Sequence, residues 1–125
     1  MKVLTALLAL TLLAPLTAHS AHAAEDVIVL VDAHARPGAV DAVVAGFRRS
    51  QARCPIWQGC RRFEITISDS APSHVVVIEQ WDSIDAHKEQ VGRVFAQASF
   101  REFRALLERD LAFRYLRLDR VEGAD

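Results

Sequence analysis

The sequence predicts an α+β domain with the element order β-α-β-β-α-β, the ferredoxin-like arrangement of one antiparallel four-stranded sheet with its helices on one face. Three observations support this fold class. Apolar residues alternate in some segments and recur at spacings of three and four in others. The second and third strands are separated only by a short turn at 69–73, which allows a hairpin. The third strand then passes Trp81 and leads directly into a helix.

The first 23 residues are expected to be absent from the folded protein. Lys2 supplies a positive charge, residues 3–13 are almost wholly apolar, and Ala21-His22-Ala23 is a small-x-small cleavage site. A membrane anchor is the alternative, but the apolar run is shorter than the ~20 residues of a spanning helix. We therefore expect a signal peptide at 1–23 and an exported protein, periplasmic or secreted, whose mature domain at 24–125 has no membrane span.

Length and charge limit the classes of protein that remain. Cleavage of 23 of the 125 residues leaves 102, which is enough for one domain with one core. Loss of Lys2 leaves 14 basic residues against 16 acidic ones. This balance provides no basic surface for nucleic acid, so we expect no nucleic-acid partner.

Cys54 and Cys60 are the only cysteines, and a Pro and a Gly lie between them. In an oxidising compartment, a pair this close favours a disulfide over two free thiols. A metal site is the weaker alternative, because this spacing is unusual for zinc and no histidine lies beside the pair.

The first half of the domain is expected to contain a strand and then a helix. Residues 27–34 form an aliphatic run that is apolar on both faces at its start, and Pro37-Gly38 ends it. The helix that follows is amphipathic. Its apolar positions are Val40, Val43, Val44 and Phe47.

The second half is expected to contain three strands and a bent helix. Residues 62–68 alternate as a strand does, and the apolar block 75–78 forms its hairpin partner. Ser83 is predicted to cap a helix, and Gly92 to mark a bend between two helical pieces. Residues 113–121 are predicted to form the last strand. The apolar spacing of the second helical piece is carried by Phe100, Phe103, Leu107 and Leu111.

One face of the predicted sheet is left uncovered by this arrangement. The first and third strands carry valines and isoleucines on both faces, yet two helices cover only one. A second copy of the chain is the simplest cover, so we expect a homodimer.

The chain from 26 to 121 resembles a known family through four short motifs. These are Pro37-Gly38, Gly59-Cys60 followed by Phe63-Glu64, Glu79-x-Trp81-x-Ser83-x-x-Ala86, and Phe100-x-x-Phe103. In order and spacing they resemble the dimeric α/β-barrel proteins of the antibiotic biosynthesis monooxygenase (ABM) family, which includes quinol and anthrone monooxygenases. The resemblance implies a dimeric α/β barrel and cofactor-independent oxidation of an aromatic substrate. Haem-degrading proteins of similar fold use an asparagine on the first strand, and this sequence contains no asparagine.

The resemblance also points to catalytic residues. It places Trp81 at the pocket, where an indole can stack on a flat aromatic substrate; an ordinary core aromatic is the alternative. Family members commonly carry a helix histidine nine residues after the tryptophan, where this chain has Gln90, and His87 lies three residues earlier. His87 is the first candidate base. His34, on one strand face with Asp32, is the second. Simple solvent exposure is the alternative for both histidines.

Further candidates for substrate binding come from the same elements. Glu79 shares a strand face with Trp81, so its carboxylate is expected to be partly buried and to need an arginine or hydroxyl partner. The other two candidates are Tyr115 and Phe103.

Two functions are compatible with these residues. The sequence contains no metal cluster, phosphate loop, nucleotide fingerprint or nucleophile motif, so if the protein is an enzyme we expect it to need no cofactor or metal. Such a monooxygenase would need only a base, a dry cavity and correct orientation of a quinol or anthrone. The alternative is a non-catalytic exported module that binds a small aromatic or lipophilic ligand in the same dimeric cavity.

Overall fold

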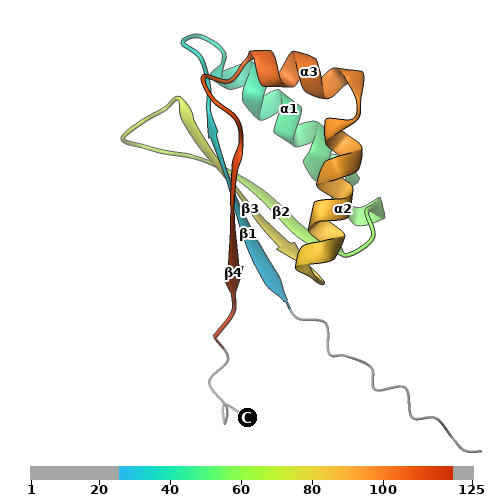
Figure 1. The fold of residues 1–125 in the computed structure, drawn as a ribbon. Coiled ribbons are helices and arrows are strands. Elements are labelled where there is room, and N and C mark those ends of the chain that lie inside the picture. The colour runs from blue at the N-terminus through green and yellow to red at the C-terminus, as the bar shows by residue number, and fades with distance from the viewer. Residues whose placement is uncertain (1–25, 120–125) are drawn as a thin grey trace, which may run out of the picture.

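A computed structural model describes residues 26–119 as one four-stranded sheet with three α-helices (Figure 1). The strands follow the order β2-β3-β1-β4, and every neighbouring pair is antiparallel. Their bounds are β1 Val27–His34, β2 Cys60–Ile67, β3 His74–Trp81 and β4 Ala112–Arg117. The ferredoxin-like α+β prediction is confirmed. The signal peptide predicted at 1–23 lies outside the described residues, as does Val121.

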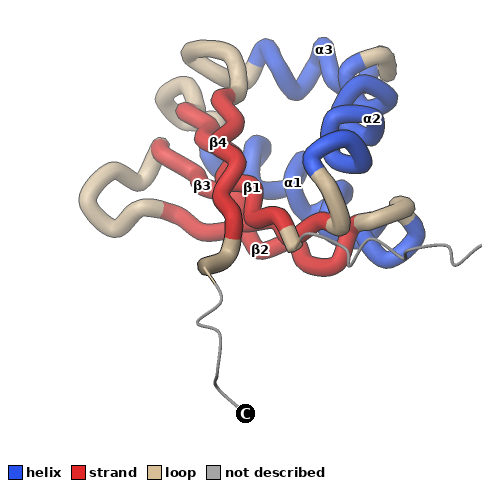
Figure 2. The backbone as a smooth tube through the Cα atoms, turned by 60° about the horizontal axis from the view of Figure 1, so that its bottom comes forward, coloured by secondary structure: helices blue, strands red, loops and turns tan. Residues whose placement is uncertain are grey.

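All three α-helices lie on the same side of the sheet, which is clear when the strands are viewed from below (Figure 2). Helix α1 (Val40–Arg53) follows β1, and α2 (Ile84–Phe95) and α3 (Ala98–Ala105) lie between β3 and β4. A single 3-10 turn, η1 (Cys54–Ile56), extends α1. None of the helices in the described part of the chain is long and apolar enough to cross a membrane.

The two faces of the sheet differ sharply in burial. Side chains that point toward the helices are buried, and Val29, Val75 and Val77 are completely inaccessible. Those that point away form a second surface, which we call the open face and which is only partly covered. Its apolar residues on β1 and β3 are Ile28, Leu30, Val76 and Ile78. The expectation that apolar residues occupy both faces is therefore confirmed.

The structure corrects the predicted bend and end of the second helical region. Gly92 lies inside α2, which continues to Phe95. The helical conformation is interrupted only afterwards, at Ala96 and Gln97. A single glycine costs only about 1 kcal/mol of helix propensity, so packing overrides it. Helix α3 ends at Ala105, and Leu107 lies beyond it, fully buried and bridged to Ala35.

The predicted disulfide between Cys54 and Cys60 is confirmed. It joins η1 to the first residue of β2 and closes a loop with Trp57 inside it. The bridge therefore fixes where α1 ends relative to the sheet.

Removal of this bridge should lower the free energy of unfolding. A cross-link that closes so short a loop contributes about 2 kcal/mol, mainly by restricting the unfolded chain. We expect urea unfolding of the double variant Cys54→Ala/Cys60→Ala to give a free energy of unfolding lower by this amount, with a correspondingly lower urea midpoint. Wild-type protein in reductant should unfold at a similar midpoint. Equal midpoints for oxidised wild type and the double variant would contradict the prediction.

Candidate active site

A cavity of about 270 Å³ lies between the helix-facing side of the sheet and helices α1, α2 and α3. Its walls are rich in aromatic side chains, as expected for a site that binds a flat organic molecule. The aromatic side chains that line it are Phe47, Trp57, Phe63, Trp81, Phe95, Phe100, Phe103 and Phe113.

Ring contacts hold these walls in place. Trp57 of the disulfide loop stacks on Trp81, with ring centroids 6.3 Å apart and an interplanar angle of 18°. The Phe103 ring meets Phe47 edge-on at 5.1 Å. A Cβ atom at Gly46 would lie 2.5 Å from the Phe103 ring, so only glycine leaves room for this ring beside α1.

Among residues 26–119, Glu79 is the only carboxylic acid that lines the cavity. It lies two residues before Trp81 on β3, so strand alternation brings both side chains to the helix-facing side. The Trp81 Nε1–H donates a hydrogen bond of 2.6 Å to Glu79 Oε2. Burial raises the pKa of Glu79 to about 7, and the indole hydrogen bond opposes that rise. A carboxyl group with such a pKa can accept a proton from a substrate near neutral pH.

His87 lies behind Glu79 and is almost completely buried. Ser83 begins α2, because its Oγ accepts a hydrogen bond of 3.1 Å from the backbone N–H of Ala86, and the first turn then carries His87 toward the sheet. Burial, and to a lesser extent the nearby Lys88, lowers the pKa of His87 to about 4. The imidazole is therefore neutral at physiological pH.

The two ring nitrogens of His87 have different neighbours. Nδ1 lies 2.9 Å from the Tyr115 hydroxyl, and Nε2 lies 3.4 Å from Glu79 Oε2 without forming a hydrogen bond to any of residues 26–119. If the Tyr115 hydroxyl donates to Nδ1, the ring proton is on Nε2 and points at the carboxyl group. This tautomer would stabilise Glu79 once it is ionised.

A family model described as antibiotic biosynthesis monooxygenase matches residues 26–106. The chain belongs to the ABM family. This match confirms the resemblance identified from the sequence motifs. A comparison with curated proteins gave no match.

Solved structures share the ABM fold with this chain. PA3566 from Pseudomonas aeruginosa is 19% identical with a TM-score of 0.62, and the alignment covers 79% of this chain and 99% of that protein. Rv0793 from Mycobacterium tuberculosis is 23% identical with a TM-score of 0.58, covering 80% and 99%. A structure titled antibiotic biosynthesis monooxygenase is 20% identical with a TM-score of 0.57, covering 76% and 98%. At these identities the likeness describes the fold alone.

The ABM domain brings some of the sequence-derived candidates together at the cavity. Trp81, Glu79 and Phe103 line it. His87 and Tyr115 lie behind Glu79 and do not line it. The hydrogen-bond partner of Glu79 is the indole of Trp81, and not the arginine or hydroxyl group that the sequence led us to expect.

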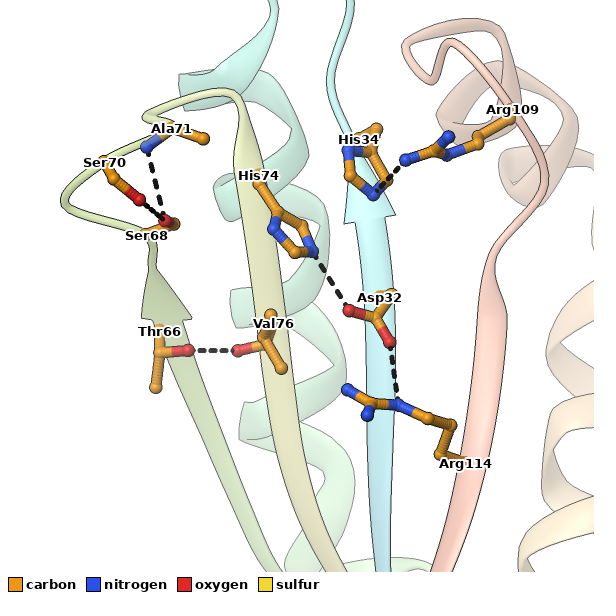
Figure 3. A network of polar contacts seen from close by, with 10 residues as sticks. All are labelled: Asp32, His34, Thr66, Ser68, Ser70, Ala71, His74, Val76, Arg109 and Arg114. Carbon is orange, nitrogen blue, oxygen red and sulfur yellow. Dashed lines mark hydrogen bonds and ion pairs between the residues drawn. The ribbon is translucent and has the colours of Figure 1, made fainter.

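His34 is remote from these groups. It ends β1 on the open face, where its ring stacks on His74 with centroids 4.2 Å apart. Figure 3 shows it in front of the strands with Arg109, while Asp32 contacts both His74 and Arg114 nearby and α1 lies behind the sheet. The sheet itself therefore separates His34 from the cavity.

Several cavity residues of this ABM domain were not among the sequence-derived candidates. Gln90 is buried and lines the cavity, one turn after His87. Trp57 could have been suspected, since a disulfide was expected to hold its loop. Arg49 and Arg53 on α1 also line the cavity. Residues 26–119 contain no group of three His, Cys, Asp or Glu side chains arranged to hold a metal ion.

Proposed function

We propose that this ABM-family protein is a cofactor-independent monooxygenase that oxidises a quinol, anthrone or similar aromatic hydroxy compound with O₂. One observation carries the proposal: a single carboxyl group with a pKa of about 7 lines a cavity rich in aromatic side chains, among residues 26–119. The sequence suggested His87 or His34 as the base. We instead assign that role to Glu79, because it reaches the cavity and is half ionised near pH 7.

The proposed reaction begins with proton transfer to Glu79. The ionised carboxylate removes a proton from the substrate, and the resulting anion gives one electron to O₂ to form a substrate radical and superoxide. These combine through a new C–O bond into a peroxide, which takes the proton back from Glu79. Loss of water then leaves a carbonyl group, so that CH₂ and O₂ become C=O and H₂O. The protein supplies the base and the orientation, and the aromatic side chains of the cavity surround the reacting part of the substrate.

His87 and Tyr115 would act as positioning residues in this scheme. Their hydrogen bond fixes the imidazole beside Glu79, and the Nε2–H would stabilise the carboxylate form that accepts the proton. Trp81 would combine two roles, since its ring lines the cavity and its N–H binds the base.

A second candidate function is non-catalytic binding of a small aromatic or lipophilic ligand by an exported dimer. Gln90 favours this candidate, because a neutral amide occupies the cavity position at which relatives commonly carry a histidine. An amide cannot act as a base near neutral pH.

Oxygen uptake separates the two candidates. We expect metal-free protein to consume O₂ with at least one member of a panel of anthrones and hydroquinones, at a rate that depends on protein concentration. The two tryptophans of the chain both line the cavity, so quenching of their fluorescence reports binding independently. Quenching without O₂ uptake above background would overturn the monooxygenase and support the binding module.

Trp81→Phe should move the pH profile of the reaction. Phenylalanine keeps an aromatic ring but lacks the N–H that stabilises ionised Glu79. Since a hydrogen bond to a charged group contributes roughly 1.5–3 kcal/mol, the midpoint of the rate should rise by about one pH unit or more. Trp57→Phe is the matched control, because Trp57 lines the same cavity without bonding to Glu79. An unshifted midpoint in Trp81→Phe would contradict this role.

A homodimer formed through the open face remains part of the proposal. Its apolar residues Ile28, Leu30, Val76 and Ile78 are only partly covered in a single chain, and Leu116 of β4 is 45% exposed beside them. A second copy would bury these side chains. The cavity lies on the opposite side of the sheet, so the proposed dimer would leave α1 accessible.

A further inference from the structure

The cavity contains two positive charges that the proposed oxidation does not require. Arg49 and Arg53 lie one turn apart on α1, with Ser50 beside them, and all three line the cavity. Both arginines are exposed, whereas Glu79 is buried, so the positive charges lie at the solvent side of the cavity. The cavity thus has an aromatic body, a buried carboxyl group and a cationic rim, which we define as Arg49 and Arg53.

The cationic rim has no anionic partner within residues 26–119. Neither guanidinium group makes an ion pair or hydrogen bond there, whereas other arginines do: Arg61 pairs with Asp82 and Arg93 with Glu89. Like charges four residues apart on a helix repel each other and weaken it slightly. Glu79, the only carboxylic acid of the described residues that lines the cavity, already accepts the Trp81 hydrogen bond.

We propose that the ligand of this site is an aromatic compound with a carboxylate substituent, held by Arg49 and Arg53 at the rim while its rings occupy the aromatic cavity. The planar guanidinium group presents paired N–H donors that match the two oxygens of a carboxylate. The assignment names the substrate class of the proposed monooxygenase and rests on that function only for the carbon that is oxidised. Binding itself requires no turnover.

This arrangement would also orient the substrate. A carboxylate held at the rim directs the opposite end of a flat molecule toward Glu79 and Trp81. Because the carboxylate would be repelled by ionised Glu79, the reverse orientation is disfavoured. A neutral analogue of the same shape has no carboxylate for the rim to hold, so it should bind more weakly and in no preferred orientation.

The test compares anthraquinone-2-carboxylate with its methyl ester, using quenching of the Trp57 and Trp81 fluorescence at low salt. We expect wild-type protein to bind the carboxylate at least about tenfold more tightly than the ester, as charge-assisted hydrogen bonds allow. The double variant Arg49→Gln/Arg53→Gln should lose this preference and bind both probes about equally. Circular dichroism of each variant checks that it is folded.

A control variant that loses the same charge distinguishes an effect of the cationic rim from an effect of the net charge of the protein. Arg48→Gln/Arg101→Gln removes two exposed arginines, from α1 and α3, that do not line the cavity, and it should keep the preference. Equal affinities of the wild type for acid and ester, no binding of either, or the same loss in both double variants would overturn the proposal. O₂ uptake without a preference for the acid would refute only this inference, and a preference without O₂ uptake only the proposed oxidation.

Discussion

Replacing Glu79 by glutamine should lower the rate of O₂ consumption by about 100-fold or more, because the cavity then has no group that can accept the substrate proton. Glutamine keeps the size of the side chain and an oxygen that accepts the Trp81 hydrogen bond. Ligand quenching of tryptophan fluorescence should therefore survive the substitution. A variant that binds ligand and retains most of the wild-type rate would exclude Glu79 as the base.

The pH dependence of the O₂ consumption rate tests the assignment of Glu79 as the base a second time. Because Glu79 must be ionised to accept a proton, the wild-type rate should rise with pH through about 7, the pKa of this carboxyl group. The residual rate of Glu79→Gln should lose this rise. If His87 were the base instead, its pKa of about 4 would give a wild-type rate that is already constant between pH 6 and 8.

The pH dependence of the free energy of unfolding should report the shifted pKa values of Glu79 and His87 without any substrate. Folding raises the pKa of Glu79 from 4.5 to about 7, so its contribution to stability is lost as the pH rises through about 7. Folding lowers the pKa of His87 from 6.5 to about 4, so its contribution is lost as the pH falls toward 4. Between pH 4.5 and 6.5 the two slopes oppose each other. In Glu79→Gln the histidine slope is unopposed, so its free energy of unfolding should rise more steeply with pH than that of the wild type.

Local sequence patterns predicted the fold because each element has a strong local signal. The period of two placed Glu79 and Trp81 on one face of β3, the short turn required the hairpin, and Ser83 had the chemistry of a helix cap. The proximity of Cys54 and Cys60 similarly predicted their disulfide. These features depend on neighbours within a few residues of one another.

The function of individual side chains at the site depends instead on packing between elements. His87 and Gln90 are one turn apart on α2, and only the depth at which α2 packs on the sheet brings Gln90 to the cavity and His87 behind Glu79. The pKa of Glu79 likewise reflects burial by segments distant in sequence. Arg49 and Arg53 are exposed polar residues of an amphipathic helix, so hydropathy alone could not distinguish them from any solvated surface.

The two apolar faces of the sheet posed a related difficulty, which the structure resolves for Val29 and Val76. Both residues are apolar and belong to central strands, but Val29 is fully buried under the helices and Val76 lies on the open face between Asp32 and Thr66. Alternation along each strand separates its residues into two faces, but only the register between β1 and β3 shows that Val29 and Val76 lie on different faces of the sheet. This difference makes the two residues a matched pair for testing the proposed dimer.

Val76→Lys should convert the proposed dimer into a folded monomer. The lysine would place a charge in the apolar contact between two copies, at a cost of several kcal/mol, whereas in a single chain it can reach water beside Asp32. Val29→Lys should instead prevent folding, since the same charge would be buried in the core without a partner. Sedimentation and circular dichroism together distinguish the outcomes: we expect a wild-type dimer at micromolar concentration, a folded Val76→Lys monomer and an unfolded Val29→Lys chain. A monomeric wild type, or a Val76→Lys variant that stays dimeric, would show that the open face is not the interface.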